Sequence, residues 1–338
     1  MANVHFGNIG DVWKHLPLSE ILSIEKPLHY WESHAGSASY PLTHSEERDY
    51  GVYHFAAHSA AWPVLARSPY LQLLTVGETA DAVSAYPGSP LIAMTVLREL
   101  ATDYLFCDVD GDSLRDIRLR AKQMGIPSVR VITCAAEGIR TVFGEASRLK
   151  ADDCSRVFLF IDPYEPFGRS EAGMDSVQLF CVAAEKGIKV MLWYAYHSHS
   201  ERATLIARIR EAARGRATTQ RAPMSFWSGN VSLAAIEDPT FAEKVGILGC
   251  GIVCGNMSDQ SISVCQSLGE ALSEVYAGTR FPSGRSGALQ FNSITISCPA
   301  QHRAIAANGG RGLRATHTER HISVTMEESD SPEGKVPL

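Results

Sequence analysis

The chain has 338 residues, of which 45% are hydrophobic, so it can fill one large domain or two small ones and is not disordered throughout. The formal net charge of −6 argues against a strongly basic nucleic-acid-binding surface, although a local basic patch is compatible with it. Because the sequence carries no signal peptide and no apolar stretch long enough to span a membrane, we expect a cytoplasmic protein without a membrane partner.

Residues 1–40 are predicted to form a helix and the first strand of a larger domain. Apolar and polar residues alternate at helical spacing over residues 11–24, and Pro17 inside this stretch predicts a kink or a restart. The apolar run at 28–31 predicts the strand. A turn of small residues that contains Gly36 follows it.

Residues 41–88 lack any regular rhythm of strands and helices and contain several prolines. A plain loop of this length is improbable inside a compact domain. We therefore predict an inserted helical subdomain in this part of the chain.

Residues 89–298 alternate regularly between strand-like and helix-like segments. Strands are predicted at 104–108, 128–133, 156–161 and 189–194, and helices at 91–101, 113–124, 137–149, 175–186 and 201–214. This alternation predicts an α/β fold with a doubly wound parallel sheet. Segments near 224–235 and 247–254, joined without a helical crossover, predict an antiparallel pair at one edge, and 290–297 predicts a final strand. Residues 299–338 have the composition of a tail.

Two strand ends carry the most informative residues. The first strand ends in Tyr30-Trp-Glu-Ser-His-Ala-Gly-Ser37, and a later one ends in Phe158-Leu-Phe-Ile-Asp-Pro-Tyr-Glu165. In an open parallel sheet both ends reach the same edge, where ligands bind. A carboxylate at Asp162 and a nearby carbonyl can accept two N–H bonds of an amine and aim its lone pair, while Pro163 fixes the turn and Tyr164 stacks on the acceptor. This corner indicates methyl transfer from S-adenosylmethionine (SAM) to nitrogen, or else an ordinary βα loop.

Four further positions are candidates for cofactor binding. Gly36 lets the backbone approach a ligand, and the absence of GxGxxG argues against a dehydrogenase. Asp108 ends a strand where an acid commonly binds ribose hydroxyls, but the alternative is a solvated loop acid. Glu137-Gly138 offers a carboxylate to an adenine amino group, or is simply an acid that begins a helix. Ser89 opens a rigid helix start whose free N–H groups suit a carboxylate, or it is a plain helix cap.

A metal site is not expected. The eight cysteines lie mostly in apolar runs, and Cys250 and Cys254 have no second pair that would complete a zinc site. The histidine pairs His197/His199 and His54/His58 have no carboxylate at ligand spacing.

Several motifs in order along the chain resemble the RlmJ family of SAM-dependent methyltransferases that act on adenine N6 of large-subunit ribosomal RNA. The motifs that carry this resemblance are Gly7-Asn-Ile-Gly-Asp-Val-Trp-Lys14-His15, Ser33-His34-Ala35-Gly36, Tyr86-Pro-Gly-Ser-Pro-Leu-Ile-Ala93, Leu97-Arg98-Glu99, Ile161-Asp162-Pro163 and Leu192-Trp193-Tyr194. The resemblance runs from about residue 5 to residue 298.

The resemblance implies a class I methyltransferase sheet with an antiparallel edge hairpin and a catalytic role for Asp162. It also implies SAM contacts from six residues, namely His15, His34, Ser89, Asp108, Glu137 and Gly138. Lys14, Glu165, Trp193 and Tyr194 are the candidate residues for binding the methyl acceptor.

The departures from the family fall on the acceptor side. The family writes the corner as Asp-Pro-Pro-Tyr, whereas this chain reads Asp162-Pro163-Tyr164-Glu165, which displaces the aromatic ring by one position. Only four residues precede His5, so the family's basic N-terminal element is missing, and the acidic chain weakens capture of RNA. These changes leave the cofactor motifs intact.

Three functions follow. The leading hypothesis is an N-methyltransferase whose acceptor is a small-molecule or peptide amine, with Glu165 binding a cationic group. The second is methylation of ribosomal RNA, which would be helped by a basic patch of Arg202, Arg208, Arg210, Arg214, Arg216 and Arg221, unless these arginines form a solvated helix face. The third is a non-catalytic SAM-binding protein.

Overall fold

The computed structural model describes residues 6–75, 84–171, 173–217, 224–233, 247–281 and 286–298. The predicted tail, 299–338, lies outside the described residues, as does Arg221 of the predicted basic patch.

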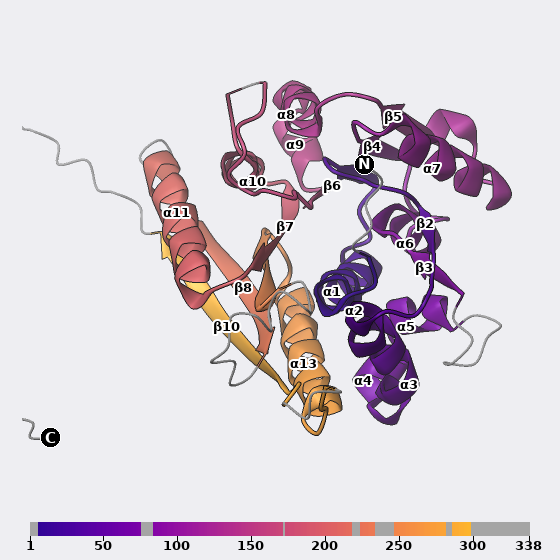
Figure 1. The fold of residues 1–338 in the computed structure, drawn as a ribbon. Helices are drawn as coiled ribbons and strands as arrows, with labels where there is room; N and C mark the ends of the chain where they lie inside the picture. The colour runs from indigo at the N-terminus through magenta and orange to yellow at the C-terminus, as the bar shows by residue number, and fades with distance from the viewer. Residues whose placement is uncertain are drawn as a thin grey trace, which may run out of the picture. The chain divides into compact units, whose positions relative to one another are not determined.

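Eight strands form one mixed sheet in the order β10-β8-β9-β7-β6-β1-β4-β5 (Figure 1). Five of them are parallel, and they are β1 (His29–Glu32), β4 (Asp103–Cys107), β5 (Val131–Cys134), β6 (Val157–Ile161) and β7 (Lys189–Tyr196). The predicted α/β class with a doubly wound sheet is confirmed. Strands β1 and β6 are neighbours, with Glu32 opposite Phe160, so the two predicted strand ends do reach the same edge.

Antiparallel strands form one edge of the sheet, as predicted. Strand β9 (Gly249–Gly255) pairs with β7 on one side and with β8 (Met224–Leu233) on the other. The predicted final strand, β10 (Leu289–Cys298), pairs along the whole length of β8 and forms the outermost strand.

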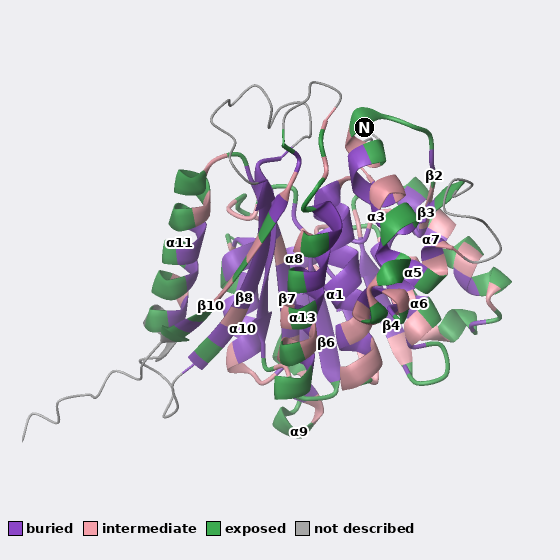
Figure 2. Cartoon of the chain, turned by 90° about the horizontal axis from the view of Figure 1, so that it is seen from below, coloured by how far each residue is buried: buried purple, intermediate pink, exposed green. Residues whose placement is uncertain are grey.

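Helices cover both faces of the sheet. One face carries α1 (Ile9–Glu25), α6 (Ser89–Val96), α7 (Gly111–Gln123) and α13 (Asp259–Tyr276), and the other carries α8 (Gly138–Arg148), α9 (Ala151–Cys154), α10 (Ser176–Glu185) and α11 (His199–Ala217). Successive strand residues point to opposite faces, so Phe158 packs with the first group of helices and Leu159 with the second. Figure 2 shows the buried residues concentrated along the strands between these two layers.

Helix α1 lies against the middle of the sheet and begins at a polar cap. The side chain of Asn8 accepts a hydrogen bond from the backbone N–H of Asp11 at 3.0 Å. The helix contains Pro17 and continues past it to Glu25. It packs against α6, α13 and β9, so its polar residues are held at the edge where β6 ends.

The region predicted as a helical insertion consists of short pieces. They are β2 (Ser39–Pro41), α2 (Glu46–Arg48), α3 (His54–His58), α4 (Pro63–Ala66), α5 (Pro69–Leu74) and β3 (Ala85–Pro87), with β2 and β3 paired. The hydroxyl of Tyr276 in α13 donates to the carbonyl of Gly51 at 2.9 Å and ties this region to the core. The division into residues 1–40, 41–88, 89–298 and 299–338 stays a prediction.

The start of α8 packs directly on the turn after β1. A Cβ atom added at Gly138 would lie 1.7 Å from the carbonyl oxygen of Ser33. Gly144, inside the same helix, has open space at the corresponding position. Close approach of two backbone segments therefore requires a glycine at 138.

We expect Gly138→Ala to destabilise the protein by about 2 kcal/mol or more, because the methyl group displaces backbone. Gly144→Ala, the matched control, should be neutral or stabilising by about 0.5–1 kcal/mol. Urea unfolding of both variants measures the difference. Equal stabilities of the two variants would contradict this packing.

Candidate functional site

The turn after β1 gathers the acidic side chains of three other loops around His34. Burial lowers the pKa of His34, while the carboxylates of Asp162, Asp108 and Glu137 act in the opposite direction. Four of the candidate residues, from the ends of β1, β4, β5 and β6, therefore lie within electrostatic reach of one another. They come together at the carboxyl edge of the parallel strands, where ligands bind in open α/β sheets.

Gly36 and Asp108 contact each other directly. The backbone N–H of Gly36 donates to Asp108 Oδ2 at 2.7 Å, and Gly36 has a φ of +63°, in the left-handed region that glycine adopts without strain. The other oxygen of Asp108 accepts from the backbone N–H of Asp110 at 2.7 Å. Asp108 thus holds two loops in place at the edge.

Glu137 begins α8. Its two carboxylate oxygens accept from the backbone N–H groups of Ile139 and Arg140, at 3.0 and 2.9 Å. This is the helix-start arrangement that was the alternative in the sequence. Gly138 lies behind it, against Ser33.

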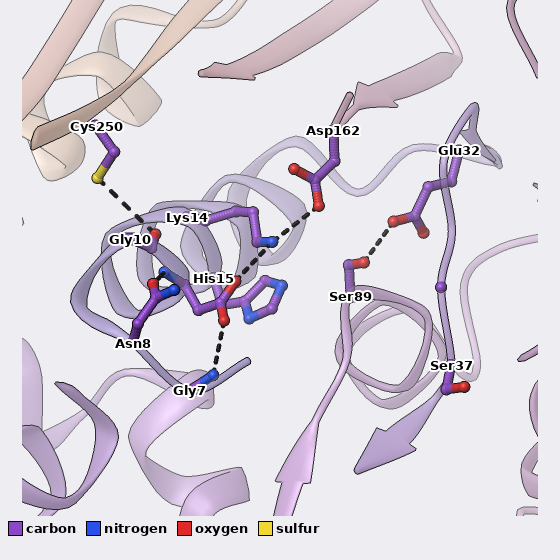
Figure 3. Close-up of polar contacts among 12 residues, drawn as sticks. Gly7, Asn8, Gly10, Lys14, His15, Glu32, Ser37, Ser89, Asp162 and Cys250 are labelled. Atoms are coloured by element: carbon purple, nitrogen blue, oxygen red, sulfur yellow. Dashed lines mark hydrogen bonds and ion pairs between the residues drawn. The ribbon is translucent and has the colours of Figure 1, made fainter. Parts of the chain in front are cut away.

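The charged centre of the edge is formed by α1 and the end of β6. Lys14 Nζ lies 2.8 Å from Asp162 Oδ2 and 2.8 Å from Asp11 Oδ1, and all three side chains are at most 15% exposed (Figure 3). The ring centroid of Trp193 lies 5.0 Å from the same nitrogen. Asp11 also accepts from the backbone N–H of Gly7 at 2.7 Å.

Burial alone would lower the pKa of Lys14, but Asp11 and Asp162 outweigh it, and the pKa is raised above its usual value. Lys14 therefore stays protonated throughout the neutral range. The cation fixes one oxygen of Asp162, Oδ2, and leaves Oδ1 for another donor. Asp11 was named in the sequence only as part of a motif, without a role.

Glu32 is a buried acid to which the sequence patterns assigned no role. It ends β1, is fully buried, and accepts a hydrogen bond from the hydroxyl group of Ser89 (Figure 3). It also accepts a hydrogen bond from the hydroxyl group of Tyr30. Burial raises its pKa well above 4.5, and the nearby carboxylate of Asp162 adds to this. The two carboxyl groups at this edge therefore have different surroundings, since Glu32 is enclosed by hydroxyl groups and Asp162 pairs with a cation. The signal was present, because Glu32 is an acid at a strand end like Asp108.

Ser89 and His15 lie on either side of the same space. Ser89 is the first residue of α6, with Gly88 rather than Ser89 at the cap position, and its hydroxyl is bound to Glu32. Burial lowers the pKa of His15, so its ring is neutral, and Nδ1 is hydrogen-bonded to the hydroxyl of Tyr86. The other ring nitrogen, Nε2, is buried without a partner in the described part of the chain.

A buried ring nitrogen without a partner is rare in a folded protein, because it loses its hydrogen bond to water. At His15 a polar group of a ligand could satisfy this atom. The residues present therefore fit a cofactor with polar groups, such as SAM.

The residues predicted to bind the methyl acceptor lie in different places. Trp193 and Lys14 lie together, whereas Tyr194 points to the opposite face of the sheet, where it is fully buried with its hydroxyl 3.3 Å from Ser228 Oγ. Tyr164 is 93% exposed, and Glu165 beside it is exposed too. The structure therefore brings Lys14, Asp162 and Trp193 together, and does not bring Tyr164 or Tyr194 to them.

A cavity of about 310 Å³ lies between the loop that follows Asp162, the end of β7 and the first turns of α11. Its lining is Pro166, Phe167, Ala195, Ser200, Glu201, Thr204 and Leu205. Glu201 is the one charged group in this lining. Arg208, from the predicted basic patch, stacks on Phe167 at 4.0 Å and lies 3.5 Å from Asp175, so it is already engaged within the protein.

No protein-family model matches the chain, and no curated protein matches it significantly. Among solved structures, protein LPL1258 of Legionella pneumophila, described with the family model DUF519, is 20% identical with a TM-score of 0.64. The match covers 86% of this chain and 98% of that one. This likeness shows a shared fold.

Two other solved structures match more weakly. A SAM-dependent methyltransferase of Agrobacterium tumefaciens is 13% identical over 74% of this chain and 63% of that one, with a TM-score of 0.37. Protein SMU.1697c of Streptococcus mutans, in complex with SAH, is 10% identical over 70% and 93%, with a TM-score of 0.32.

Metal sites and membrane-spanning helices were both considered among the described residues. No three His, Cys, Asp or Glu side chains in the described ranges are grouped so that they could hold a metal ion. No helix in those ranges is long and apolar enough to cross a membrane.

The raised pKa of Glu32 predicts how stability depends on pH. A protonated Glu32 contributes stability that is complete below the unfolded pKa of 4.5 and is lost as the pH rises through the folded pKa. Gln mimics the protonated acid and does not titrate. The unfolding free energy of Glu32→Gln minus that of the parent should therefore increase with pH above 4.5, by up to about 1.4 kcal/mol per pH unit.

Urea unfolding at a series of pH values checks this prediction. The matched control is Glu99→Gln, at a glutamate that is 88% exposed. A difference between Glu32→Gln and the parent that does not grow with pH, or that grows no more than the difference for the control, would contradict the prediction.

Proposed function

We propose that this protein is a SAM-dependent N-methyltransferase whose acceptor is a small-molecule or peptide amine. The observation that carries the proposal is the ion pair between Lys14 and Asp162 at the carboxyl edge of the sheet. It leaves one carboxylate oxygen in a fixed position beside Trp193, among residues suited to a polar cofactor. The DUF519 family, to which the Legionella neighbour is assigned, is the RlmJ family, which supports a methyltransferase origin.

The cofactor would lie across the ends of β1, β4 and β5. His15 Nε2, His34 and the start of α6 at Ser89 would face its polar groups, and Asp108 with the Gly36 turn would border its ribose. Bound SAM would supply a methyl group on a positively charged sulfur, and a nucleophile would attack the carbon of that methyl group. Asp11, Asp162 and protonated Lys14 together carry a net charge of −1, and this suits a cationic cofactor.

Asp162 would position the acceptor nitrogen. Because Lys14 occupies Oδ2, Oδ1 is the oxygen that accepts an N–H of the amine and turns the lone pair toward the methyl group. The nitrogen would become positively charged as it takes the methyl group, while the bond between sulfur and methyl breaks and the neutral thioether leaves. The carboxylate at Asp162 would stabilise the charge on the nitrogen, which would then lose a proton to water. Lys14 would hold Asp162 in place by its ion pair with Oδ2.

The acceptor side favours a cationic molecule over a nucleotide. Tyr164, the aromatic residue of the corner, is exposed to solvent and does not form a wall beside Asp162. The cavity beside the loop that follows Asp162 is lined by apolar and hydroxyl side chains with Glu201 as its charged group, and Glu165 lies exposed in that loop. Carboxylates repel the phosphates of RNA and attract an ammonium group.

Methylation of ribosomal RNA is the second candidate. The likeness in fold to a DUF519 protein favours it, because that family acts on an adenine amino group. A flipped adenine would present the same kind of nitrogen to Asp162. The two functions share the cofactor side and differ only in the acceptor.

We expect Asp162→Asn to bind SAM with unchanged affinity and to lose methyl transfer by about 10²-fold or more, because an amide cannot stabilise the developing charge. Calorimetry measures SAM binding, and labelled-methyl transfer measures activity. Asp152→Asn, on the exposed side of α9, is the control and should remain fully active. Undiminished turnover by Asp162→Asn would remove Asp162 from the mechanism.

The acceptor itself is tested by offering labelled SAM with two sets of substrates. One set holds amines and lysine-containing peptides, and the other is protein-free ribosomal RNA from cells that lack RlmJ-type activity. Transfer to an amine that depends on Asp162 supports the leading proposal. Transfer to RNA alone would replace it with the second candidate, and SAM binding without any transfer would make the protein a SAM-binding protein.

A further inference from the structure

Two exposed apolar side chains lie at the outer edge of the sheet. Val129 is 83% exposed and Ile132 is 51% exposed, and both belong to β5 or the turn that leads into it. They are two of the six large hydrophobic residues that are exposed in the described ranges. Apolar side chains exposed beside an open strand edge favour an interaction surface there.

Strand β5 ends the sheet, so one side of its backbone is open. It pairs with β4 in parallel, from Val131 opposite Tyr104 to Cys134 opposite Cys107, and no described strand lies on its other side. An open strand edge presents a row of N–H and C=O groups that can pair with another strand. Natural edges are commonly protected by lysine or proline, whereas β5 exposes isoleucine.

The two faces of β5 offer different surroundings to an added strand. Val131 packs with α7, and Thr133 on the same face accepts a hydrogen bond from Arg118 of α7 at 2.5 Å. A cavity of about 420 Å³ opens on this face, lined by Arg118, Ala121, Lys122, Ile126, Ser128 and Val131. Ile132 points to the other face. A strand added beside β5 would therefore place alternate side chains into the cavity and over Ile132.

The charges at this edge favour an acidic partner. Arg118 and Lys122 line the cavity, and no acid does. The nearby acids of α7 are already paired, Asp112 with Arg115 and Asp116 with Arg120. A second copy of this chain would bring its own Arg118 and Lys122 against the first pair, and like charges would disfavour that contact. The phosphates of a nucleic acid would make no favourable contact with the apolar side chains of Val129 and Ile132.

We propose that the open edge of β5 is a docking site for an extended peptide segment of a partner protein, apolar in its middle and acidic at its ends. The segment adds a strand parallel or antiparallel to β5. Its main chain pairs with the free edge, one apolar side chain enters the cavity beside α7, and its acids meet Arg118 and Lys122. This site is independent of methyl transfer and does not require SAM.

Fluorescence anisotropy of the full chain with a labelled peptide, Glu-Asp-Val-Thr-Val-Ile-Val-Thr-Asp-Glu, tests the proposal. A second peptide carries Lys and Arg in place of the four acids. We expect the acidic peptide to bind more tightly than the basic one. Lys122→Glu should weaken the acidic peptide by about tenfold and strengthen the basic one, a reversal that unfolding cannot produce.

Two further variants sharpen the test. Ile132→Glu should weaken the binding of both peptides. Lys150→Glu, at an exposed lysine directly before α9, should change the binding of neither. Equal binding of the two peptides by the parent, or no binding of either, would overturn the proposal. A dimer that Ile132→Glu dissociates in sedimentation would also overturn it, in favour of a second copy. If the protein bound RNA and Lys122→Glu abolished that binding, the proposal would be overturned in favour of a nucleic-acid site.

Discussion

The site depends on one buried cation. Lys14 is held by Asp11 one turn earlier in α1 and by Asp162 at the end of β6, and it joins a helix from the start of the chain to a strand in its middle. Removing one partner of such a pair costs about 3–5 kcal/mol, since it leaves an unpaired charge inside the protein. The same contact that stabilises the packing of α1 on the sheet therefore sets the charge, position and free oxygen of Asp162.

The ionisable groups of the edge differ in burial and in partners. Glu32 is enclosed and accepts hydrogen bonds from hydroxyl groups, and burial raises its pKa, whereas Asp162, on the neighbouring strand, pairs with Lys14. His15 and His34 have lowered pKa values for the same reason as Glu32 has a raised one, because burial disfavours the charged form. In the proposed reaction a cofactor would meet the rings and hydroxyl groups here, and the reacting nitrogen would meet the free oxygen of Asp162.

Local sequence patterns predicted the parallel strands, because each apolar run was bounded by a turn and followed by a helix. The ends of β1 and β6 were placed at one edge for that reason. Trp193 and Tyr194 were both assigned to the acceptor, although alternation along a strand places neighbouring residues on opposite faces of the sheet. The patterns also did not predict that Tyr30 and Ser89 enclose Glu32. Helix α13 was missed even though Ser258 caps it and apolar residues recur at helical spacing. The position of β10 outside β8 depends on long-range pairing that no local pattern encodes.

We propose that the edge formed by α1, β1 and β6 binds SAM, and isothermal titration of SAM into the full chain tests this, with His34→Ala as the comparison. We expect saturable binding at one site per chain, weakened by about tenfold or more in the variant because three carboxylates of the edge lie around His34. A folded protein that gives no saturable heat with SAM, or that binds SAM equally well without the His34 ring, would show that this edge is not a SAM site.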